Sequence, residues 1–360
     1  MVDDVTYQFE YAQRIRCAFV GAGEHAFRNV YPALQYAPVD LVAICDLRSD
    51  RATAYARLFG AEQVFGDYER MLAEVAPEAV FVVTGYSPDG RVQATDIAAG
   101  CVRAGAHVWM EKPTAASMAE IIDLQKAARV AGRFVMTGLK KIFTPAVEKA
   151  EQIISSAEFG SPTSISVRYP QDLPPESQRD LDSMRGFLDH IYHPAAVINF
   201  LMGPVERMSY EREPRAGGTV TTMRFCSGAI GTMHLVAGIA QTSPVERIEV
   251  IGRDANVVID NGVTLTYYRP GARLAYGRSG SYVVADDVAP LVWQPEFSLG
   301  QLYNKNLFLL GYVPEIMHFC ESVQAGRPPT KGTLDDSLEI MRIFEAYQHN
   351  PAGSSIVLRR

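Results

Sequence analysis

The chain has 360 residues, more than a single core of about 100 to 200 residues accommodates, so two packed domains are expected. Its 48% hydrophobic and 21% charged residues are typical of a folded protein and exclude a disordered or collagen-like chain. The formal charge of -7, from 41 acidic and 34 basic residues, disfavours nucleic acid and anionic membranes as partners and favours a small molecule.

The sequence shows no sign of export or membrane insertion. No apolar run reaches the roughly 18 residues that span a bilayer, and the opening MVDDVTYQFE lacks the regions of a signal peptide. We therefore expect a cytoplasmic protein with no membrane partner. The cysteines are odd in number and scattered, so we expect reduced core thiols, with neither disulfides nor a metal knuckle. They are Cys17, Cys45, Cys101, Cys226 and Cys320.

After a polar leader at residues 1–13, predicted strands alternate with predicted helices. The strands are expected at 15–20, 40–45, 63–65, 79–83, 107–110 and 133–137. The helices are expected directly after the glycine turn at 21–26 and at 50–59, 68–75, 91–103 and 117–130. This alternation implies right-handed crossovers and a parallel sheet covered on both faces. We predict a doubly wound α/β domain over residues 14–138.

The pattern changes over residues 139–360, where strands follow one another directly. Further strands are expected at 164–169, 219–225, 229–236, 247–251, 257–259, 263–265 and 355–358. Further helices are expected at 145–155, 184–202, 313–325 and 334–348. Asp260-Asn261-Gly262 predicts a type I′ hairpin turn, and the region 270–301, rich in Gly, Pro and Ser, predicts long loops. This half is predicted to be an antiparallel sheet with helices.

The turn after the first strand has the sequence Gly21-x-Gly23-x-x-Ala26. The first glycine permits a tight turn, the second allows the backbone to approach a pyrophosphate, and the helix that follows offers N–H groups to the phosphates. Alone, the motif also suits a packing turn. Asp46, at the end of the second strand, is placed to accept hydrogen bonds from the adenosine ribose. We therefore predict a Rossmann dinucleotide-binding domain.

The expected cofactor is NAD, because a 2′-phosphate would be repelled by Asp46. Arg48 or Arg51 could instead pair with that phosphate, which leaves NADP as the alternative. The other expected cofactor contacts lie at the carboxyl ends of the strands and in the first turn of the helix, where ligands of open parallel sheets bind. They are Glu24, His25, Thr84, Glu111 and Lys112.

The fifth strand runs into Glu111-Lys112-Pro113, which places a lysine where it can polarise a substrate oxygen, although a Lys-Pro pair is also common in ordinary loops. A second group is Asp189 and His193, four residues apart on one helix face. When hydride leaves a carbinol carbon the hydroxyl proton must leave too, and a histidine with a pKa of about 6.5 can accept it.

Asp189 can contact the substrate or hold His193. The same segment also suits a helix histidine with no catalytic role, or a metal site that adds His190. No fourth ligand at metal spacing is evident nearby, so no metal is expected.

Together these segments resemble the glucose-fructose oxidoreductase, inositol dehydrogenase and MocA (Gfo/Idh/MocA) family. The resemblance spans nearly the whole chain from about residue 14, and Glu-Lys-Pro after the fifth strand is its most specific part. The matching segments are Gly21-Ala22-Gly23 with Asp46, Ala104-Gly105-Ala106-His107-Val108 leading into Glu111-Lys112-Pro113, Asp189 with His193, Gly311-Tyr312, and Gly326-Arg327-Pro328.

The resemblance implies a Rossmann domain joined to an α+β domain with a large open, mainly antiparallel sheet, and terminal helices that pack back on the Rossmann domain. It implies a sugar or polyol substrate, with Lys112, Asp189 and His193 at the reacting hydroxyl, and homodimers or homotetramers formed through the open sheet. Tyr169 and Arg185 are further expected substrate contacts from their positions. The chain departs from the family pattern at Ile191 and Ala196, and these departures leave the type of substrate open.

We therefore predict an NAD(P)-dependent dehydrogenase or reductase acting on a CH–OH group. One alternative is a glycosidase of the same fold that oxidises and re-reduces its sugar with bound NAD and returns the cofactor unchanged. The other is a non-catalytic nucleotide-sensing regulator, which would need the pyrophosphate loop but no proton acceptor.

Overall fold

A computed structural model describes residues 11–240, 242–271, 289–294 and 305–359. Most of the loop region predicted at 270–301 therefore lies outside the described residues. The chain divides into two compact units, one formed by Met1–Lys140 with Asn306–Met341 and the other by Lys141–Lys305 with Arg342–Arg360. None of the helices in the described ranges is both long and apolar enough to cross a bilayer.

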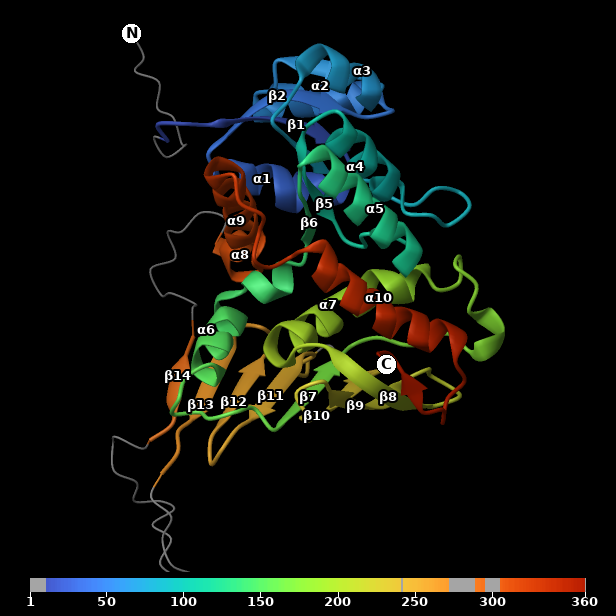
Figure 1. Ribbon diagram of the computed structural model, residues 1–360, viewed down its shortest axis with the longest axis vertical. Coiled ribbons are helices and arrows are strands. Elements are labelled where there is room, and N and C mark those ends of the chain that lie inside the picture. Colours follow the sequence, from blue (N-terminus) through green and yellow to red (C-terminus); the bar gives the residue numbers. More distant parts are fainter. Residues whose placement is uncertain (1–10, 241, 272–288, 295–304, 360) are drawn as a thin grey trace, which may run out of the picture. The chain divides into compact units, whose positions relative to one another are not determined.

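The first unit contains a six-stranded, all-parallel sheet with the order β3-β2-β1-β4-β5-β6 (Figure 1). Its strands are β1 (Ile15–Val20), β2 (Val39–Cys45), β3 (Gln63–Phe65), β4 (Ala79–Val82), β5 (His107–Glu111) and β6 (Val135–Gly138). Every residue of β4 and β6 is buried, as expected for strands covered on both faces. The strand order reverses between β1 and β4, and ligands of such sheets bind at the carboxyl ends of the strands at this point.

The helices of the first unit cover the sheet, and the helix after β1 widens into a π-helical segment. They are η1 (Ala26–Val30, π-helical), α1 (Tyr31–Leu34), α2 (Ser49–Phe59), α3 (Tyr68–Val75), α4 (Gln93–Arg103), α5 (Met118–Ala131) and α9 (Tyr312–Ala325). Two starts are capped by side chains, because Asp67 accepts a hydrogen bond from the Arg70 N–H and Ser117 accepts one from the Glu120 N–H. Helix α9 packs against α1, β1 and β5 although it lies far along the chain.

The second unit contains a nine-stranded sheet with the order β14-β13-β12-β11-β7-β10-β9-β8-β15. Its strands are β7 (Ser164–Tyr169), β8 (Val205–Arg212), β9 (Thr219–Phe225), β10 (Ile230–Leu235), β11 (Arg247–Ile251), β12 (Asn256–Asp260), β13 (Thr264–Tyr268), β14 (Leu291–Trp293) and β15 (Ile356–Val357). Strands β7 and β10 pair in parallel, and all other neighbours are antiparallel. The predicted fold class, a Rossmann domain with a mainly antiparallel α+β domain, is confirmed.

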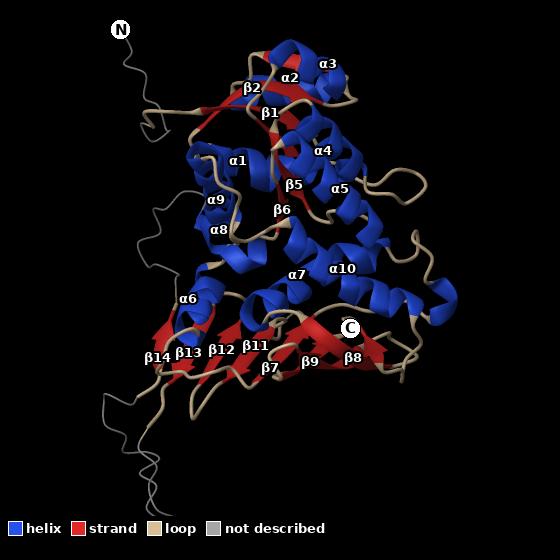
Figure 2. Cartoon of the chain, in the orientation of Figure 1, coloured by secondary structure: helices blue, strands red, loops and turns tan. Residues whose placement is uncertain are grey.

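Helices α6 (Pro145–Ile154) and α7 (Arg185–Met202) cover one face of this sheet, and no helix of the described residues covers the other (Figure 2). Burial alternates strictly along β9, as expected for a sheet covered on one side. The remaining helical elements are η2 (Lys140–Phe143), η3 (Glu176–Gln178), α8 (Lys305–Leu309) and α10 (Leu334–His349).

Most predicted elements are present within one or two residues, and the hairpin turn is confirmed because Asn261 (φ 53°) and Gly262 (φ 67°) both have positive φ. Strands β8 and β14 were not predicted. The three residues of β14 are too few for a periodic signal, and the strand is an edge strand. The prediction that all cysteines lie in the cores is wrong for Cys226, which is exposed just after β9; the other four are buried, and all five are free.

Candidate active site

The glycine loop between β1 and the following helix uses its two glycines for different reasons. Gly21 has a φ of +112°, and a Cβ at this position would lie 1.9 Å from the carbonyl oxygen of Val83. Only glycine fits there. A Cβ at Gly23 would meet no atom within 4 Å, so the open side of the loop begins at this residue.

Side chains hold the loop from behind. Tyr31 donates a hydrogen bond to the Gly21 carbonyl (3.1 Å), and Tyr55 donates one to the Gly23 carbonyl (3.2 Å). Asp46 accepts the Ala22 N–H through Oδ2 (2.7 Å). In these bonds the carbonyl oxygens of the loop, which carry partial negative charge, point toward the tyrosine hydroxyls. The open side of the loop is then free of these carbonyl oxygens, which favours the binding of an anion there.

The tyrosine hydroxyls are themselves placed by ring packing. The Tyr31 ring stacks on Phe19, with a centroid distance of 3.9 Å, and on Phe59 at 4.7 Å. Tyr55 meets Tyr31 edge-on at 5.3 Å and contacts Phe27 at 5.5 Å. Neither tyrosine was predicted from the sequence, because the role of each depends on the packing of three elements.

The remaining predicted cofactor residues of the first strands lie around this loop. Asp46 also accepts the Arg48 N–H through Oδ1 (2.8 Å), so each of its carboxylate oxygens accepts a hydrogen bond from a backbone N–H group. The Arg48 guanidinium pairs with Asp50 at 2.8 Å, and Glu24 pairs with Arg28 at 2.5 Å. The Thr84 hydroxyl, just beyond β4, is buried with no hydrogen-bond partner in the described part of the chain.

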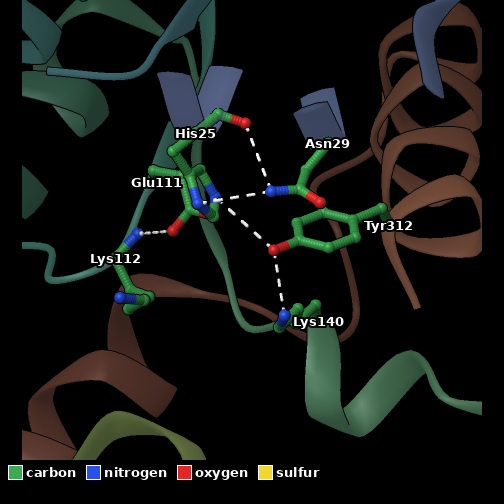
Figure 3. A network of polar contacts seen from close by, with 6 residues as sticks. All are labelled: His25, Asn29, Glu111, Lys112, Lys140 and Tyr312. Carbon is green, nitrogen blue, oxygen red and sulfur yellow. Dashed lines mark hydrogen bonds and ion pairs between the residues drawn. The ribbon is translucent and has the colours of Figure 1, made fainter. Parts of the chain in front are cut away.

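Glu111, the last residue of β5, connects several of these groups (Figure 3). Its Oε1 lies 2.8 Å from His25 Nε2, and its Oε2 accepts the Lys112 N–H at 2.7 Å. The side chain of Lys112 extends away from this carboxylate (Figure 3). Burial opposes the charged form of Glu111, but the hydrogen bond from His25 and the charge of Lys112 outweigh it and hold its pKa below the usual value.

Helix α9 completes the network through Tyr312. The Tyr312 hydroxyl accepts a hydrogen bond from Lys140 Nζ (2.9 Å) and lies 3.5 Å from His25 Nε2 (Figure 3). Burial and the nearby carboxylate of Glu111 raise the pKa of Tyr312, so its hydroxyl stays protonated. Lys140 was not predicted, and Tyr312 was named only as part of the Gly311-Tyr312 segment that resembles the family.

One turn further along α9, Glu315 is fully buried, and neither of its carboxyl oxygens has a hydrogen-bond partner among the described residues. Burial raises the pKa of Glu315 well above its usual value, and the charge of Glu111 raises it further. Burial therefore favours the neutral form of Glu315, and a neutral carboxyl group costs less to bury than a charged one.

In the second unit, Asp189 and His193 are half-buried and occupy the i and i+4 positions of α7. The ring of His193 lies 6.1 Å from the buried ring of Tyr169 on β7. His190 is exposed, and its Nδ1 lies 2.8 Å from the Gly186 carbonyl oxygen of the same helix. The residues Ile191 and Ala196 are both buried.

A narrow cavity of the second unit borders His193, Tyr169 and the ion pair of Lys141 with Glu246. Lys141 Nζ lies 2.7 Å from each Glu246 carboxylate oxygen. The predicted substrate contact Arg185 pairs with Asp182 at 2.6 Å in the first turn of α7. Among the described residues, no group of three or more His, Cys, Asp or Glu side chains is arranged to hold a metal ion.

The residues of the first unit fit a dinucleotide. The open side at Gly23 leaves the space that a Cβ would fill, and the loop carbonyls accept hydrogen bonds from behind. The buried hydroxyl of Thr84 has no hydrogen-bond partner among the residues that the structure describes. These features lie at the reversal of strand order, where open α/β sheets bind nucleotides. Fold and site thus define a dinucleotide-binding protein, and Lys112 directly follows β5 at the carboxyl end of the sheet.

The chain belongs to the Gfo/Idh/MocA family of oxidoreductases. The family model described as "Oxidoreductase family, NAD-binding Rossmann fold" matches residues 15–139, and the family's C-terminal domain model matches residues 147–258. This confirms the predicted family, the oxidoreductase class and NAD as the cofactor of the fold.

Curated relatives cover nearly the whole chain at low identity. Myo-inositol 2-dehydrogenase from Thermotoga maritima is 22% identical over 321 residues, covering 85% of this chain and 87% of the relative. D-xylose 1-dehydrogenase (NADP(+)) 2 from Haloferax volcanii is 25% identical over 350 residues, covering 94% and 98%. An oxidoreductase from Agrobacterium radiobacter, solved with NAD+, L-tartaric acid and magnesium, has a TM-score of 0.76 at 15% identity and covers 96% of this chain and 99% of its own.

Proposed function

We propose that the protein transfers hydride between a nicotinamide cofactor and a CH–OH carbon of a sugar, polyol or related hydroxylated substrate. The observation that carries the proposal is a glycine loop that is open at Gly23 and is followed by His25, which contacts Glu111 at the end of β5. Glu111 in turn accepts the N–H of Lys112. The relatives named for inositol and xylose support this substrate class.

When bound, the cofactor supplies the hydride acceptor or donor. Lys112 polarises the substrate oxygen and stabilises charge that develops on it. His193 accepts the hydroxyl proton during oxidation and returns it during reduction, and Asp189, one turn away on α7, orients the imidazole or contacts the substrate. Tyr169 and Arg185 contribute to the substrate pocket in this scheme.

The proposed cofactor is NAD rather than NADP. Asp46 places a carboxylate where a 2′-phosphate would be repelled. The Arg48 guanidinium, which could otherwise bind that phosphate, is already paired with Asp50. Calorimetric titration with NADH and NADPH tests this point. Tighter binding of NADPH than of NADH would contradict the assignment.

The activity is tested by incubating the purified protein with NAD and NADP and a panel of sugars, inositols and their keto forms, and following absorbance of the reduced nicotinamide. His193→Ala should lower turnover by about 10²-fold or more with NADH still bound. His190→Ala, an exposed histidine of the same helix, is the matched control and should keep wild-type rates. Equal rates for both variants would remove His193 from proton transfer.

Lys112→Met should slow the chemical step and increase the primary deuterium isotope effect on turnover, since hydride transfer then limits the rate. An unchanged rate and isotope effect would dismiss its role. Cleavage of a glycosidic bond without net NADH formation would favour the NAD-assisted glycosidase, and NADH binding without turnover on any substrate would favour the regulator.

We also propose a homodimer or homotetramer formed through the open face of the nine-stranded sheet. Exposed apolar side chains lie on this face at Val220, Ile230, Ile251 and Tyr268, with exposures from 43% to 55%. Burying them against a second copy would be favourable. Sedimentation analysis should find an oligomer that Ile251→Lys weakens, whereas Val130→Lys, on exposed α5 surface, leaves it intact. A monomeric wild type would refute this.

The proposed location is the cytoplasm. The buried cysteines are free thiols, which persist in a reducing compartment.

A further inference from the structure

Glu111 is a buried carboxylate whose two oxygens contact two different segments of the chain. Its exposure is 7%; Oε1 faces His25 Nε2 at 2.8 Å, and Oε2 accepts the Lys112 N–H at 2.7 Å. His25 belongs to the first turn after the glycine loop, whereas Lys112 follows β5. One side chain therefore connects the turn that would face the phosphates to the backbone of the lysine.

The donor pattern around His25 assigns its hydrogen to Nε2. Asn29 Nδ2 lies 3.4 Å from His25 Nδ1 and donates to the His25 carbonyl at 3.3 Å, so Nδ1 accepts and Nε2–H donates to Glu111. Asn29 lies in the π-helical segment Ala26–Val30, a distortion that recurs at functional sites.

The carboxylate has little room to find other partners. A Cβ at Gly138 on β6 would lie 3.4 Å from Glu111 Cδ and 3.0 Å from the Trp109 ring, so β6 closes that side. On the other side, Tyr312 lies 3.5 Å from His25 Nε2 and is held by Lys140 at 2.9 Å. Removing His25 would thus leave a buried, charged oxygen unpaired, which is costly.

We propose that Glu111 and His25 are positioning residues that couple cofactor binding at the glycine loop to the orientation of Lys112, with Tyr312 supporting the His25 ring. The inference rests on the proposed function, because it assigns Lys112 to the substrate oxygen. A cofactor that orders the first turn also orders His25, and through Glu111 the main chain of Lys112. The two oxygens of one rigid carboxylate make this coupling direct.

The first test is a double-mutant cycle on NADH affinity, measured by calorimetry with His25→Leu, Glu111→Gln and the double variant. Each single change should weaken NADH binding by about 10-fold, the scale of a hydrogen bond to a charged group. The double variant should bind no more weakly than the weaker single, because both changes break the same link. Multiplying effects, or wild-type affinity for His25→Leu, would overturn the inference.

Two further variants separate positioning from a general loss of structure. His25→Gln keeps a side-chain N–H donor of similar reach and should restore NADH affinity to within about threefold of wild type. Glu74→Gln, an exposed carboxylate of the same unit paired with Arg70 at 2.7 Å, is the control and should bind as wild type. A His25→Gln protein as impaired as His25→Leu would contradict the assigned hydrogen bond.

The second test needs no turnover. Amide hydrogen exchange of the peptide around Lys112 should slow when NADH saturates the wild type, and this slowing should be absent in His25→Leu saturated with NADH. Equal slowing in both proteins would refute the coupling while leaving the proposed function intact. Failure of the wild type to bind NADH at all would refute both.

Discussion

Alanine at Gly21 and at Gly23 adds the same methyl group at two positions of the glycine loop with opposite surroundings. At Gly21 the methyl carbon would lie 1.9 Å from the Val83 carbonyl oxygen, far below the 3.4 Å of an ordinary contact, and φ is +112°. At Gly23 it would have no neighbour within 4 Å. The first change should therefore damage the fold, and the second should affect only what approaches the loop.

The magnitudes follow from these surroundings. A positive φ costs an L-residue about 1–2 kcal/mol and overpacking about 1–3 kcal/mol, so Gly21→Ala should lose roughly 2–5 kcal/mol. At about 2–4 °C per kcal/mol for a domain of roughly 150–250 residues, that loss lowers Tm by about 4–20 °C. Gly23→Ala should keep its Tm, but a methyl group in the path of a pyrophosphate costs about 1–3 kcal/mol of binding, or roughly 5- to 150-fold in Kd.

Thermal unfolding of both variants without ligand, followed by calorimetric titration with NADH, separates the two effects. Because Gly23→Ala retains the fold, any loss of affinity reports on the loop itself. If Gly23→Ala bound NADH as tightly as the wild type, or Gly21→Ala unfolded at the wild-type temperature, the assignment of this loop would be wrong.

Other changes probe the surroundings of the loop. Tyr55→Phe keeps the ring but removes the donor to the Gly23 carbonyl, so NADH affinity measured by calorimetry should fall about 2- to 12-fold with little change in Tm; unchanged affinity would contradict this. Asp46→Asn can accept only one of two backbone N–H groups, so it should lower both Tm and NADH affinity, and a loss of affinity alone would show that the backbone bonds contribute little. Burial raises the pKa of Glu315 above its usual 4.5, so wild-type stability from this group is present below pH 4.5 and is lost as pH rises toward the folded-state pKa, by about 1.4 kcal/mol per pH unit. The unfolding free energy of Glu315→Gln relative to wild type, measured by urea titration, should therefore increase with pH over that window, and a constant difference would refute the shift.

Much of the architecture follows from the sequence alone. The strands at Ser164–Tyr169, Thr219–Phe225 and Arg247–Ile251 lie at the predicted residues, because period-two burial is a local property of consecutive residues. The positive φ values at Asn261 and Gly262 were likewise predictable from the residue types. The glycine loop, Asp46 and Lys112 could be found because each follows a predictable strand.

The contacts within the candidate site were decided by the tertiary structure. His25 and Glu111 are 86 residues apart in sequence, and His25 and Tyr312 are 287 apart. In the sequence, Tyr31 and Tyr55 are indistinguishable from ordinary residues on the apolar face of a helix. Packing directs their hydroxyl groups to the carbonyl groups of the glycine loop. Burial at Glu315 favours the neutral form, whereas at Glu111 the bond from His25 outweighs it. Periodicity records which face of an element is buried, but the partner of a side-chain hydrogen bond depends on which distant elements meet there, and the sequence carries no local signal for that.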